Sequence, residues 1–439
     1  MFPFPKSSAK RALDQAEDLL RLADKVDCYR RDVVPAPALA TLRAASARLQ
    51  QLWEQKAHPE ILEKAADELH AAMLPCGGDI YPLTFASEYT EMIISAAILV
   101  IGFRTFFLEP FKIPTNSMYP TYNGMTPYVY AIDQPGPNPL AQVFNLIVQG
   151  ATHHELRAPA AGEVIIPLDD GPFTAHFEKV GVRSWSHLWL SADADREYRI
   201  FVGGQAVTDR VPMDFDYGFD QAIYETYFPD LYQQAQKDVN RMPSLLAQGG
   251  YIHHDEQGRV YLDTGHKAQA GEPILNFDLR TGDMLFVDRF SYNFIAPKVG
   301  DPIVFHTSGI KDLYTVIDGV TTQEDQNYIK RLVGGPGDVL EVHPPMLYRN
   351  GQPNTGAAAF DKNGHKVENY PGYTFGNGSA VLLQSGHPFT VPSDHYFAMG
   401  DNSPTSYDGR YWGPVPAQNI VGRAVVIIYP FTFRWGLAK

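Results

Sequence analysis

Two short segments, far apart in this chain of 439 residues, carry side chains that could do chemistry together. PTNSMYPT (114–121) holds Ser117 between two prolines that restrict the backbone on both sides, which suits a positioned nucleophile. YIKRLVGGPGD (328–338) places Lys330 on a predicted strand, between two large and mostly apolar neighbours on the same face. A neutral lysine could take the proton of a serine hydroxyl. Taken singly, the first segment could also be a plain turn and the second an exposed edge strand.

The neutral amine sets a physical requirement. A free lysine with a pKa near 10.4 is neutral in only about one molecule in a few thousand at pH 7. Lowering that pKa by roughly 3 units costs about 4 kcal/mol, and burial among apolar groups can achieve it. Tyr328 and Leu332 are the local means of burial, and the Arg331 cation could help from the other face of the strand.

Further segments predict the strands and loops around such a pair. VGDPIVFH (299–306) and TGDMLFVDRF (281–290) each begin with Gly-Asp, a turn signal, and continue as an apolar strand. Pro302 has no amide hydrogen, so we expect a sheet edge or a bulge there. MGDNSPTSYDGRYWGPVP (399–416) is dense in side chains that bond backbone groups and could make a loop rigid; these are Asp401, Asn402, Ser403, Ser406, Asp408 and Arg410.

Composition argues against several classes of protein. The formal net charge of −14 disfavours a nucleic-acid binder, because neutralising phosphates requires a basic face. Two cysteines cannot form a disulfide framework or the CxxC pairs of a structural zinc site. The histidine groups at 153–155 and 253–256 lack HExxH spacing and a third ligand, so we expect solvated loop histidines and no metal site. GGPGD lacks the spacing of a phosphate loop, and we expect no cofactor.

The N-terminal 87 residues are predicted to be helical. Apolar residues recur there at three- and four-residue steps in three segments, which Pro35 and then His58-Pro59 separate. This pattern predicts a small helical bundle or hairpin, with a partner-binding coiled coil as the alternative.

The most apolar stretch, 92–108, predicts a transmembrane helix. Its roughly 17 residues are the lower limit for a span, and aromatic residues crowd its exit end. A buried core helix is the alternative, because the uninterrupted apolar part ends at Phe103. Arg104 and Lys112 follow the span, so positive-charge counting favours an N-terminus outside the cell.

From Pro114 onward the chain reads as short β-rich runs separated by Gly, Pro and Asn. AVLLQ (380–384) and the closing AVVIIYPF (424–431) are two of the predicted strands. Residues 122–280 contain the strand-like pieces GEVIIPL and YRIFVGG and a polar, helical stretch around 220–240, without a legible motif.

Together these segments resemble the type I signal peptidases, membrane-anchored Ser/Lys endopeptidases that remove signal peptides from exported proteins. The apolar helix ending in Arg-Thr-Phe and PFKIPTNSM is similar to the family's anchor and nucleophile segment. YIKRLVGGPGD and GDNSPTSYDGRYWGPVP resemble its lysine and C-terminal boxes, and NIVGRAVVIIYPF its final strand. The resemblance covers about 90–121 and 282–430, in the family's order.

The resemblance implies a mainly β catalytic domain of antiparallel sheets, preceded by an N-terminal helical region and one transmembrane helix. Residues 1–87 would then be the helical region, on the cytoplasmic side, and 88–110 the anchor. Residues 111–121 and 281–439 would form the catalytic domain, and 122–280 an inserted domain of unknown role.

The resemblance also implies roles by position. Ser117 would be the nucleophile and Lys330 the general base. Thr115 matches a hydroxyl that completes the oxyanion hole with the nucleophile's own amide, and Ser406 matches a serine that orients the lysine. Gly409 stands where many members have serine, which puts one minor contact in doubt. Residues expected to support the site are Tyr328, Arg331, Asp401, Asn402, Asp408 and Arg410.

The implied activity is cleavage after a small residue, as in Ala-X-Ala, with the extended substrate pairing by strand addition. The implied partners are signal peptides of exported pre-proteins and the lipid bilayer, with the secretion translocon as a further candidate. The family's orientation implies a single-pass protein in the cytoplasmic (inner) membrane, with its catalytic domain on the extracytoplasmic side. This orientation is opposite to the one that positive-charge counting favours.

Three alternatives stay open from the sequence. One is a dedicated peptidase with a single substrate, and another is a catalytically inactive membrane-anchored scaffold on the same fold. A self-cleaving repressor also uses serine and lysine, but it would be soluble and bind DNA, which the apolar helix and the acidic charge disfavour.

Overall fold

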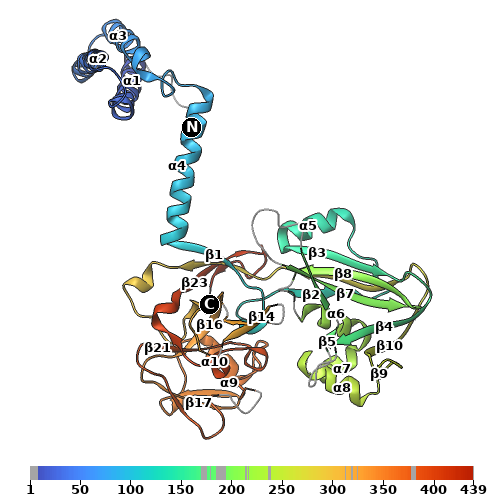
Figure 1. Cartoon of the computed structure of the whole chain (residues 1–439). Helices are drawn as coiled ribbons and strands as arrows, with labels where there is room; N and C mark the ends of the chain where they lie inside the picture. Colours follow the sequence, from blue (N-terminus) through green and yellow to red (C-terminus); the bar gives the residue numbers. More distant parts are fainter. Residues whose placement is uncertain are drawn as a thin grey trace. The chain divides into compact units, whose positions relative to one another are not determined.

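The computed structural model contains two compact units, Met1–Phe103 and Arg104–Lys439 (Figure 1). The residues described are 8–169, 176–177, 179–183, 194–212, 215, 217–235, 239–311, 313–317, 320–323, 325–376 and 382–438.

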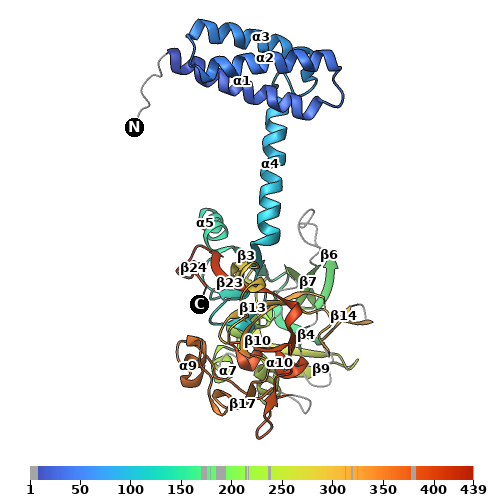
Figure 2. The same cartoon turned by 90° about the vertical axis from the view of Figure 1, so that its left-hand side faces the viewer.

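The N-terminal unit is helical, as predicted. Its helices α1 (Ser8–Arg30), α2 (Ala36–Glu54) and α3 (Pro59–Gly77) pack around a common apolar core that includes Leu49 and Leu69 (Figure 2). Pro35 and His58 occupy the N-cap positions of α2 and α3, so the predicted breaks are the points where these helices begin.

Helix α4 (Phe85–Phe106) contains the predicted anchor. Its window Tyr89–Phe106 has a mean hydropathy of 1.4, and none of that window is buried. Length and composition therefore make it a candidate membrane span. The helix ends before the predicted boundary at 110, because Leu108–Lys112 instead pairs into the first strand of the second unit.

An antiparallel sheet forms the centre of the second unit outside residues 122–280. Register shifts between neighbouring strands, for example at Met284/Leu285, bend it. Antiparallel sheets were predicted, and this sheet confirms them. In order across the sheet its strands are β1 (Leu108–Lys112), β12 (Met284–Asp288), β23 (Ile420–Tyr429), β13 (Pro302–His306), β16 (Asn327–Gly334), β21 (His395–Met399) and β22 (Val415–Pro416), with β24 (Gly436–Leu437) added to β23.

Two strand predictions need correction. Pro302 does not mark a sheet edge, because β13 lies between β16 and β23. Pro302 is the first residue of the strand, where a missing amide hydrogen is tolerated, and the register shift falls at Val304/Phe305. Of the predicted strand 380–384, only Leu382–Gln384 lies within the described residues, and that stretch is not a strand.

Smaller elements complete this part of the second unit. A second antiparallel sheet carries helix α9 (Ala358–His365) beside it and has its own apolar core around Leu340 and Phe360. A separate hairpin pairs β14 (Tyr314–Ile317) with β15 (Val320–Gln323). The strands of the second sheet are β17 (Val339–His343), β18 (Met346–Arg349), β19 (Gln352–Pro353) and β20 (Phe389–Thr390).

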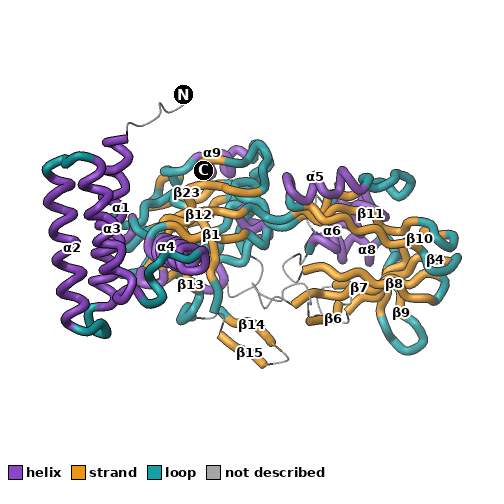
Figure 3. Tube along the Cα trace, turned by 90° about the horizontal axis from the view of Figure 1, so that it is seen from above, coloured by secondary structure: helices purple, strands orange, loops and turns teal. Residues whose placement is uncertain are grey.

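The segment 122–280 folds as β-sheets with helices, around a core that includes Ile166, Phe219 and Phe277 (Figure 3). The predicted strands at GEVIIPL and YRIFVGG are present, and the polar stretch after 218 is helical, as predicted. One sheet consists of β2 (Thr126–Val129), β11 (Pro273–Arg280) and β3 (Ala151–Arg157). The other contains β4 (Gly162–Asp169), β5 (His176–Phe177), β6 (Lys179–Arg183), β7 (Ala194–Val202), β8 (Gln205–Pro212), β9 (Ile252–His254) and β10 (Val260–Ala268), and the helices are α5 (Pro139–Gln149), α6 (Gly218–Tyr227), α7 (Pro229–Gln234) and α8 (Met242–Gln248).

The prediction of solvated loop histidines is wrong for 153–154. Both histidines lie on β3, where the ring of His153 is 2.8 Å from Asp278 and that of His154 is 3.0 Å from Asp209. Asp278 lies opposite His153 on the neighbouring strand β11, whereas Asp209 comes from β8 (Gln205–Pro212) of the other sheet. His253 and His254 are exposed, as expected, but on strand β9.

The segment 122–280 leaves and rejoins the rest of the second unit at one point. Asn123 and Asp283 exchange backbone and side-chain hydrogen bonds of 2.8 Å, so the two ends of the segment lie side by side. Gly282 occupies this junction so tightly that a Cβ would lie 1.7 Å from the carbonyl oxygen of Ile113. The close approach therefore requires glycine.

Replacing Gly282 by alanine tests this junction. We expect Gly282→Ala to lower the free energy of unfolding by about 1–3 kcal/mol, because backbone must move to admit the methyl group. Gly335→Ala is the matched control, since a Cβ there would meet nothing nearer than 3.8 Å. Thermal melting followed by circular dichroism would measure both variants, and equal melting temperatures would contradict the tight junction.

Candidate active site

Ser117 lies in the short 3₁₀ helix η1 (Asn116–Met118), a few residues after β1, and is buried. Asn402 holds this turn from the far end of the chain: its amide donates to the Ser117 carbonyl and its side chain to the Asn116 carbonyl, each at 3.1 Å. Gly124 packs against the backbone of Thr115, where a Cβ would lie 2.3 Å from the carbonyl carbon. The turn that presents Ser117 is therefore fixed from two sides.

Lys330 reaches Ser117 from the middle of the sheet. It lies on β16, which is flanked by β13 and β21, and only 5% of it is exposed. Its Nζ donates to Ser117 Oγ at 2.6 Å. The Tyr328 ring centroid lies 5.5 Å from Nζ, and Leu332 is fully buried. Strand alternation thus places Lys330 inside the core and in contact with the predicted nucleophile.

Burial lowers the pKa of Lys330 to about 8. Asp408 and Asp401 oppose this shift, and the Arg410 cation adds to it. At a pKa of 8, about one molecule in ten carries the neutral amine at pH 7, compared with one in a few thousand for a free lysine. The predicted contribution of Arg331 is wrong: the cation that lowers the pKa of Lys330 is Arg410.

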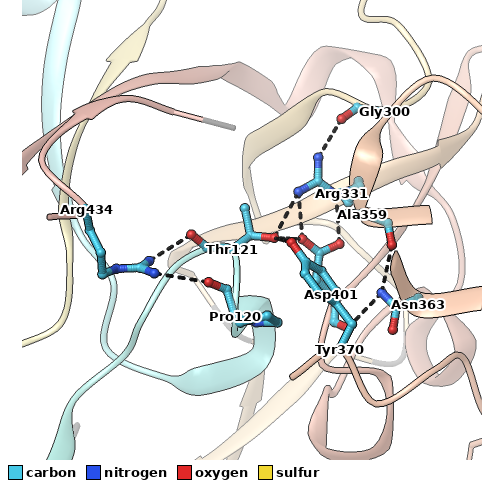
Figure 4. Close-up of polar contacts among 9 residues, drawn as sticks. All are labelled: Pro120, Thr121, Gly300, Arg331, Ala359, Asn363, Tyr370, Asp401 and Arg434. Carbon is cyan, nitrogen blue, oxygen red and sulfur yellow. Dashed lines mark hydrogen bonds and ion pairs between the residues drawn. The ribbon is translucent and has the colours of Figure 1, made fainter. Parts of the chain in front are cut away.

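Arg331 instead forms a buried ion pair with Asp401 (Figure 4). The guanidinium binds both carboxylate oxygens, at 2.7 and 2.6 Å, and a third nitrogen donates to the Gly300 carbonyl at 2.7 Å. Thr121, four residues after the nucleophile, donates to the same carboxylate. This pair therefore connects β16, the loop after β21 and the segment that follows Ser117.

A second buried ion pair joins Arg410 to Asp408. Its two hydrogen bonds measure 2.8 and 2.9 Å, and both side chains are completely buried. Burial alone would raise the pKa of Asp408, but the Arg410 charge and its hydrogen bonds hold that pKa below its ordinary value. Asp408 also accepts the Gly400 amide, and Arg410 donates to the Ser403 carbonyl at 2.6 Å. The loop after β21 is thus held rigid beside the lysine.

Thr115 and Ser406 lie next to Ser117 but make no hydrogen bond with Lys330 among the interactions of the described residues. Thr115 is exposed and extended, two residues before the nucleophile. Ser406 is buried near Gly400 and the Ser117 carbonyl, and its Oγ has no hydrogen-bond partner within the described structure. Gly409, which departs from the family's serine, lies where a Cβ would be 2.8 Å from the Ala398 carbonyl oxygen, so a serine would be crowded.

Sequence reasoning missed the residues that hold the loop after Ser117. The Arg434 guanidinium donates to the carbonyls of Pro120, at 3.1 Å, and Thr121, at 2.8 Å (Figure 4). It also pairs with the buried Asp283 at 2.5 Å. Tyr370 bonds the Thr121 hydroxyl at 2.9 Å. The single charge of Arg434 within FTFRWG was a signal that a buried partner exists, but nothing in the sequence identified that partner.

Metal chemistry has no recognisable site in the described part of the chain. No group of three or more His, Cys, Asp or Glu side chains there could hold a metal ion. His153 instead contacts the carboxylates of Asp278 and Glu155, and His154 that of Asp209. The arrangement that can do chemistry is the buried Ser117–Lys330 pair.

The chain is similar to signal peptidases. The family described as signal peptidase, peptidase S26, matches residues 275–429. A signal peptidase I of Leptolyngbya laminosa is 35% identical over 153 residues, which are 35% of this chain and 63% of that protein. A probable signal peptidase I-1 of Synechocystis sp. is 35% identical over 158 residues, 36% of this chain and 67% of that protein. A crystal structure of a signal peptidase I from Enterococcus faecalis is 28% identical with a TM-score of 0.20, covering 29% of this chain and 97% of that chain.

The buried charge of Lys330 predicts a pH-dependent stability. The folded-state pKa of about 8 lies below the ordinary 10.5, so protonated Lys330 costs about 3 kcal/mol at 1.36 kcal/mol per unit. This cost is fully present below pH 8 and disappears as the pH rises from 8 through 10.5. We therefore expect Lys330→Met to raise the melting temperature at pH 6–7, with a gain that shrinks toward pH 10.

The exposed Lys298 provides the control for this comparison. Lys298→Met should leave the melting temperature nearly unchanged at every pH, because its amine keeps its water. A Lys330→Met gain that stayed constant from pH 6 to 10 would show that the lysine is not desolvated.

Proposed function

The chain belongs to the signal peptidase family, peptidase S26, and on that premise we propose that it is a serine endopeptidase that removes signal peptides from exported pre-proteins. The observation that carries the proposal is the buried hydrogen bond of 2.6 Å between Lys330 Nζ and Ser117 Oγ, with the pKa of the lysine lowered to about 8. A nucleophile and a base within hydrogen-bond reach are what acyl transfer requires.

In the first half of the reaction, Ser117 Oγ attacks the scissile carbonyl carbon and its proton passes to the neutral Lys330 Nζ. The tetrahedral intermediate places a negative charge on the carbonyl oxygen. The Ser117 amide and the exposed Thr115 hydroxyl are the proposed donors to that oxygen. The intermediate then collapses, the C–N bond breaks, and Lys330 returns the proton to the leaving amine.

In the second half, Lys330 takes a proton from water, whose oxygen attacks the Ser117 ester. The Lys330 proton then goes to Ser117 Oγ as the ester bond breaks, which regenerates the pair. Ser406, buried beside Gly400, is proposed to orient the lysine in its protonated state. Asn402, Asp408 and Arg410 keep the loop in place throughout, and Tyr328 contributes to the dehydration of the amine.

The proposed substrate is an extended peptide with small residues before the cleaved bond, as in Ala-X-Ala. Such a peptide can add to a sheet edge by backbone hydrogen bonds, with alternate side chains entering shallow pockets. β1 is an edge strand of the main sheet within the described structure, and it leads directly to the Ser117 turn. This connection supports recognition beside the nucleophile.

Helix α4 is proposed to anchor the protein in the cytoplasmic membrane by a single span, with the catalytic part on the extracytoplasmic side. Its 18-residue apolar window supports this role, because a span needs about 17–25 such residues. The anchor would hold the site where the apolar segment of an exported pre-protein resides, with the secretion translocon as a further partner. A scaffold without activity has no need of a dehydrated lysine, whose burial costs stability.

Removing either member of the pair should abolish cleavage. We expect Ser117→Ala and Lys330→Ala each to lower kcat/KM for an Ala-X-Ala reporter peptide by about 10³-fold or more, with little further loss in the double variant. This non-additivity follows because the two side chains act as one unit. Lys298→Ala, an exposed lysine outside the site, is the control. Near-full activity of Lys330→Ala would refute the proposed base.

The pH profile of the intact protein reports the state of the base. Cleavage needs the neutral amine, so kcat/KM should rise with pH, tenfold per unit well below pH 8, and level off above about 8. Steady-state rates between pH 5 and 10.5 would measure this profile. A rate that kept rising to pH 10 without a plateau would mean that the amine is hydrated.

A further inference from the structure

Helix α5 has its amphipathic faces reversed. Its polar side chains face the protein: Gln142 donates to the Pro137 carbonyl at 2.9 Å, and Asn145 lies 3.4 Å from the buried Asp278 carboxylate. The apolar side chains face outward, with Leu140 85% exposed and Phe144 60% exposed. Val143, Leu146 and Ile147 are exposed as well. Surface helices normally direct such residues to the core and polar ones to water.

The orientation of α5 is fixed by contacts of its C-terminal half with Tyr429 and Phe431. Asn138 caps the N-terminus by accepting the Ala141 amide at 2.9 Å, and the left-handed Gly150 ends the helix. Tyr429 donates to the Leu146 carbonyl at 2.7 Å, and the Phe431 amide donates to the Val148 carbonyl at 2.8 Å. The helix is thus docked with its apolar face outward, and that face needs a partner that accepts hydrocarbon.

The exposed apolar surface continues from α5 onto the C-terminal segment that bonds it. In 431–437, Phe433 is 98% exposed, and Trp435 and Leu437 are also exposed. Figures 1 and 2 show α5 on the same side of the second unit as the start of β1, and in the view from above in Figure 3 no helix or strand of the described residues lies over it. β1 begins at Leu108, two residues after α4 ends at Phe106, so the chain itself ties the start of β1 to the proposed anchor.

We propose that α5 is an interfacial membrane helix, which lies in the bilayer surface with its apolar face at the boundary of headgroups and acyl chains. The inference rests on the proposed anchoring by α4, because the anchor would hold this side of the unit at the membrane. An interfacial helix of this kind sinks roughly 5–10 Å below the lipid surface. The segment 122–280 thereby gains a lipid contact of its own, separate from the span.

Lipid fits this face better than a protein partner does. The helix sequence PLAQVFNLIVQ has no charged residue, in a chain with a net charge of −14, and its described polar side-chain contacts point inward. Protein interfaces have a polar rim and about one hydrogen bond per 100–200 Å², which this aliphatic face cannot supply. Phe and Trp beside an aliphatic surface are the composition of a membrane interface.

A fluorescent label on the outward face tests the proposal in the full chain. Ile147→Cys is combined with Cys28→Ala, which removes the exposed native thiol, while Cys76 is buried. The NBD-labelled protein is reconstituted in phosphatidylcholine/phosphatidylglycerol vesicles. We expect a blue-shifted emission and about a twofold or greater loss of intensity with headgroup-proximal spin-labelled lipids. Val367→Cys, an exposed apolar position outside the surface, is the control and should show neither change.

The outcomes separate this inference from the proposed function. Vesicle flotation without quenching at 147 would overturn the α5 contact and leave the anchor intact, whereas failure to float would refute both. A blue shift that depends on protein concentration would assign the outward face of α5 to a second copy of the chain. A blue shift that appears only when pre-protein is added would assign that face to the substrate. Either result would overturn the lipid contact. Val143→Cys repeats the test if Ile147→Cys misfolds. Peptidase activity in detergent measures the Ser117–Lys330 pair separately.

Discussion

The protein depends on keeping one amine, that of Lys330, out of water. Burial lowers its pKa to about 8, and an ammonium in this position costs free energy that the rest of the fold must offset. The lysine lies on a central strand, where neighbours on both sides exclude solvent. An edge strand would leave the same side chain hydrated. The strand order is therefore part of the proposed chemistry, because it decides whether the amine can act as a base.

Two buried ion pairs lie near the Lys330 amine but do not determine its protonation state. Arg331 is matched by Asp401 and Arg410 by Asp408, so the charges around the lysine largely compensate one another. Desolvation is then the dominant cause of the lowered pKa. The pairs contribute position instead: one holds the segment after the nucleophile and the other the loop after β21. Buried pairs are weak sources of stability, but they specify geometry when their remaining hydrogen bonds are satisfied, as here.

Local sequence patterns predicted much of this arrangement. They failed where contacts between residues far apart in the sequence determine the structure. Alternation on a strand was enough to place Lys330 between Tyr328 and Leu332, and proline positions were enough to mark the starts of helices. The role of Arg331 was misassigned, because its pairing with Asp401 bridges 70 residues and no spacing rule reaches that far. Likewise, Pro302 suggested an edge, although the first residue of a central strand meets the same constraint. The partner of a buried charge and the position of a strand within a sheet are both determined by tertiary packing.

The large segment 122–280 follows Ser117 almost directly, yet the Ser117–Lys330 pair stays intact because the segment begins and ends at one junction. Asn123 and Asp283 bond there, and Arg434 ties the same Asp283 to the loop behind Ser117. The residues on either side of Arg434, Phe433 and Trp435, are exposed apolar groups. A bilayer that holds those aromatics would also hold Arg434, and through it the backbone just after the nucleophile. Arg434 would then link the attachment of the protein to the membrane with the geometry of the Ser117–Lys330 site.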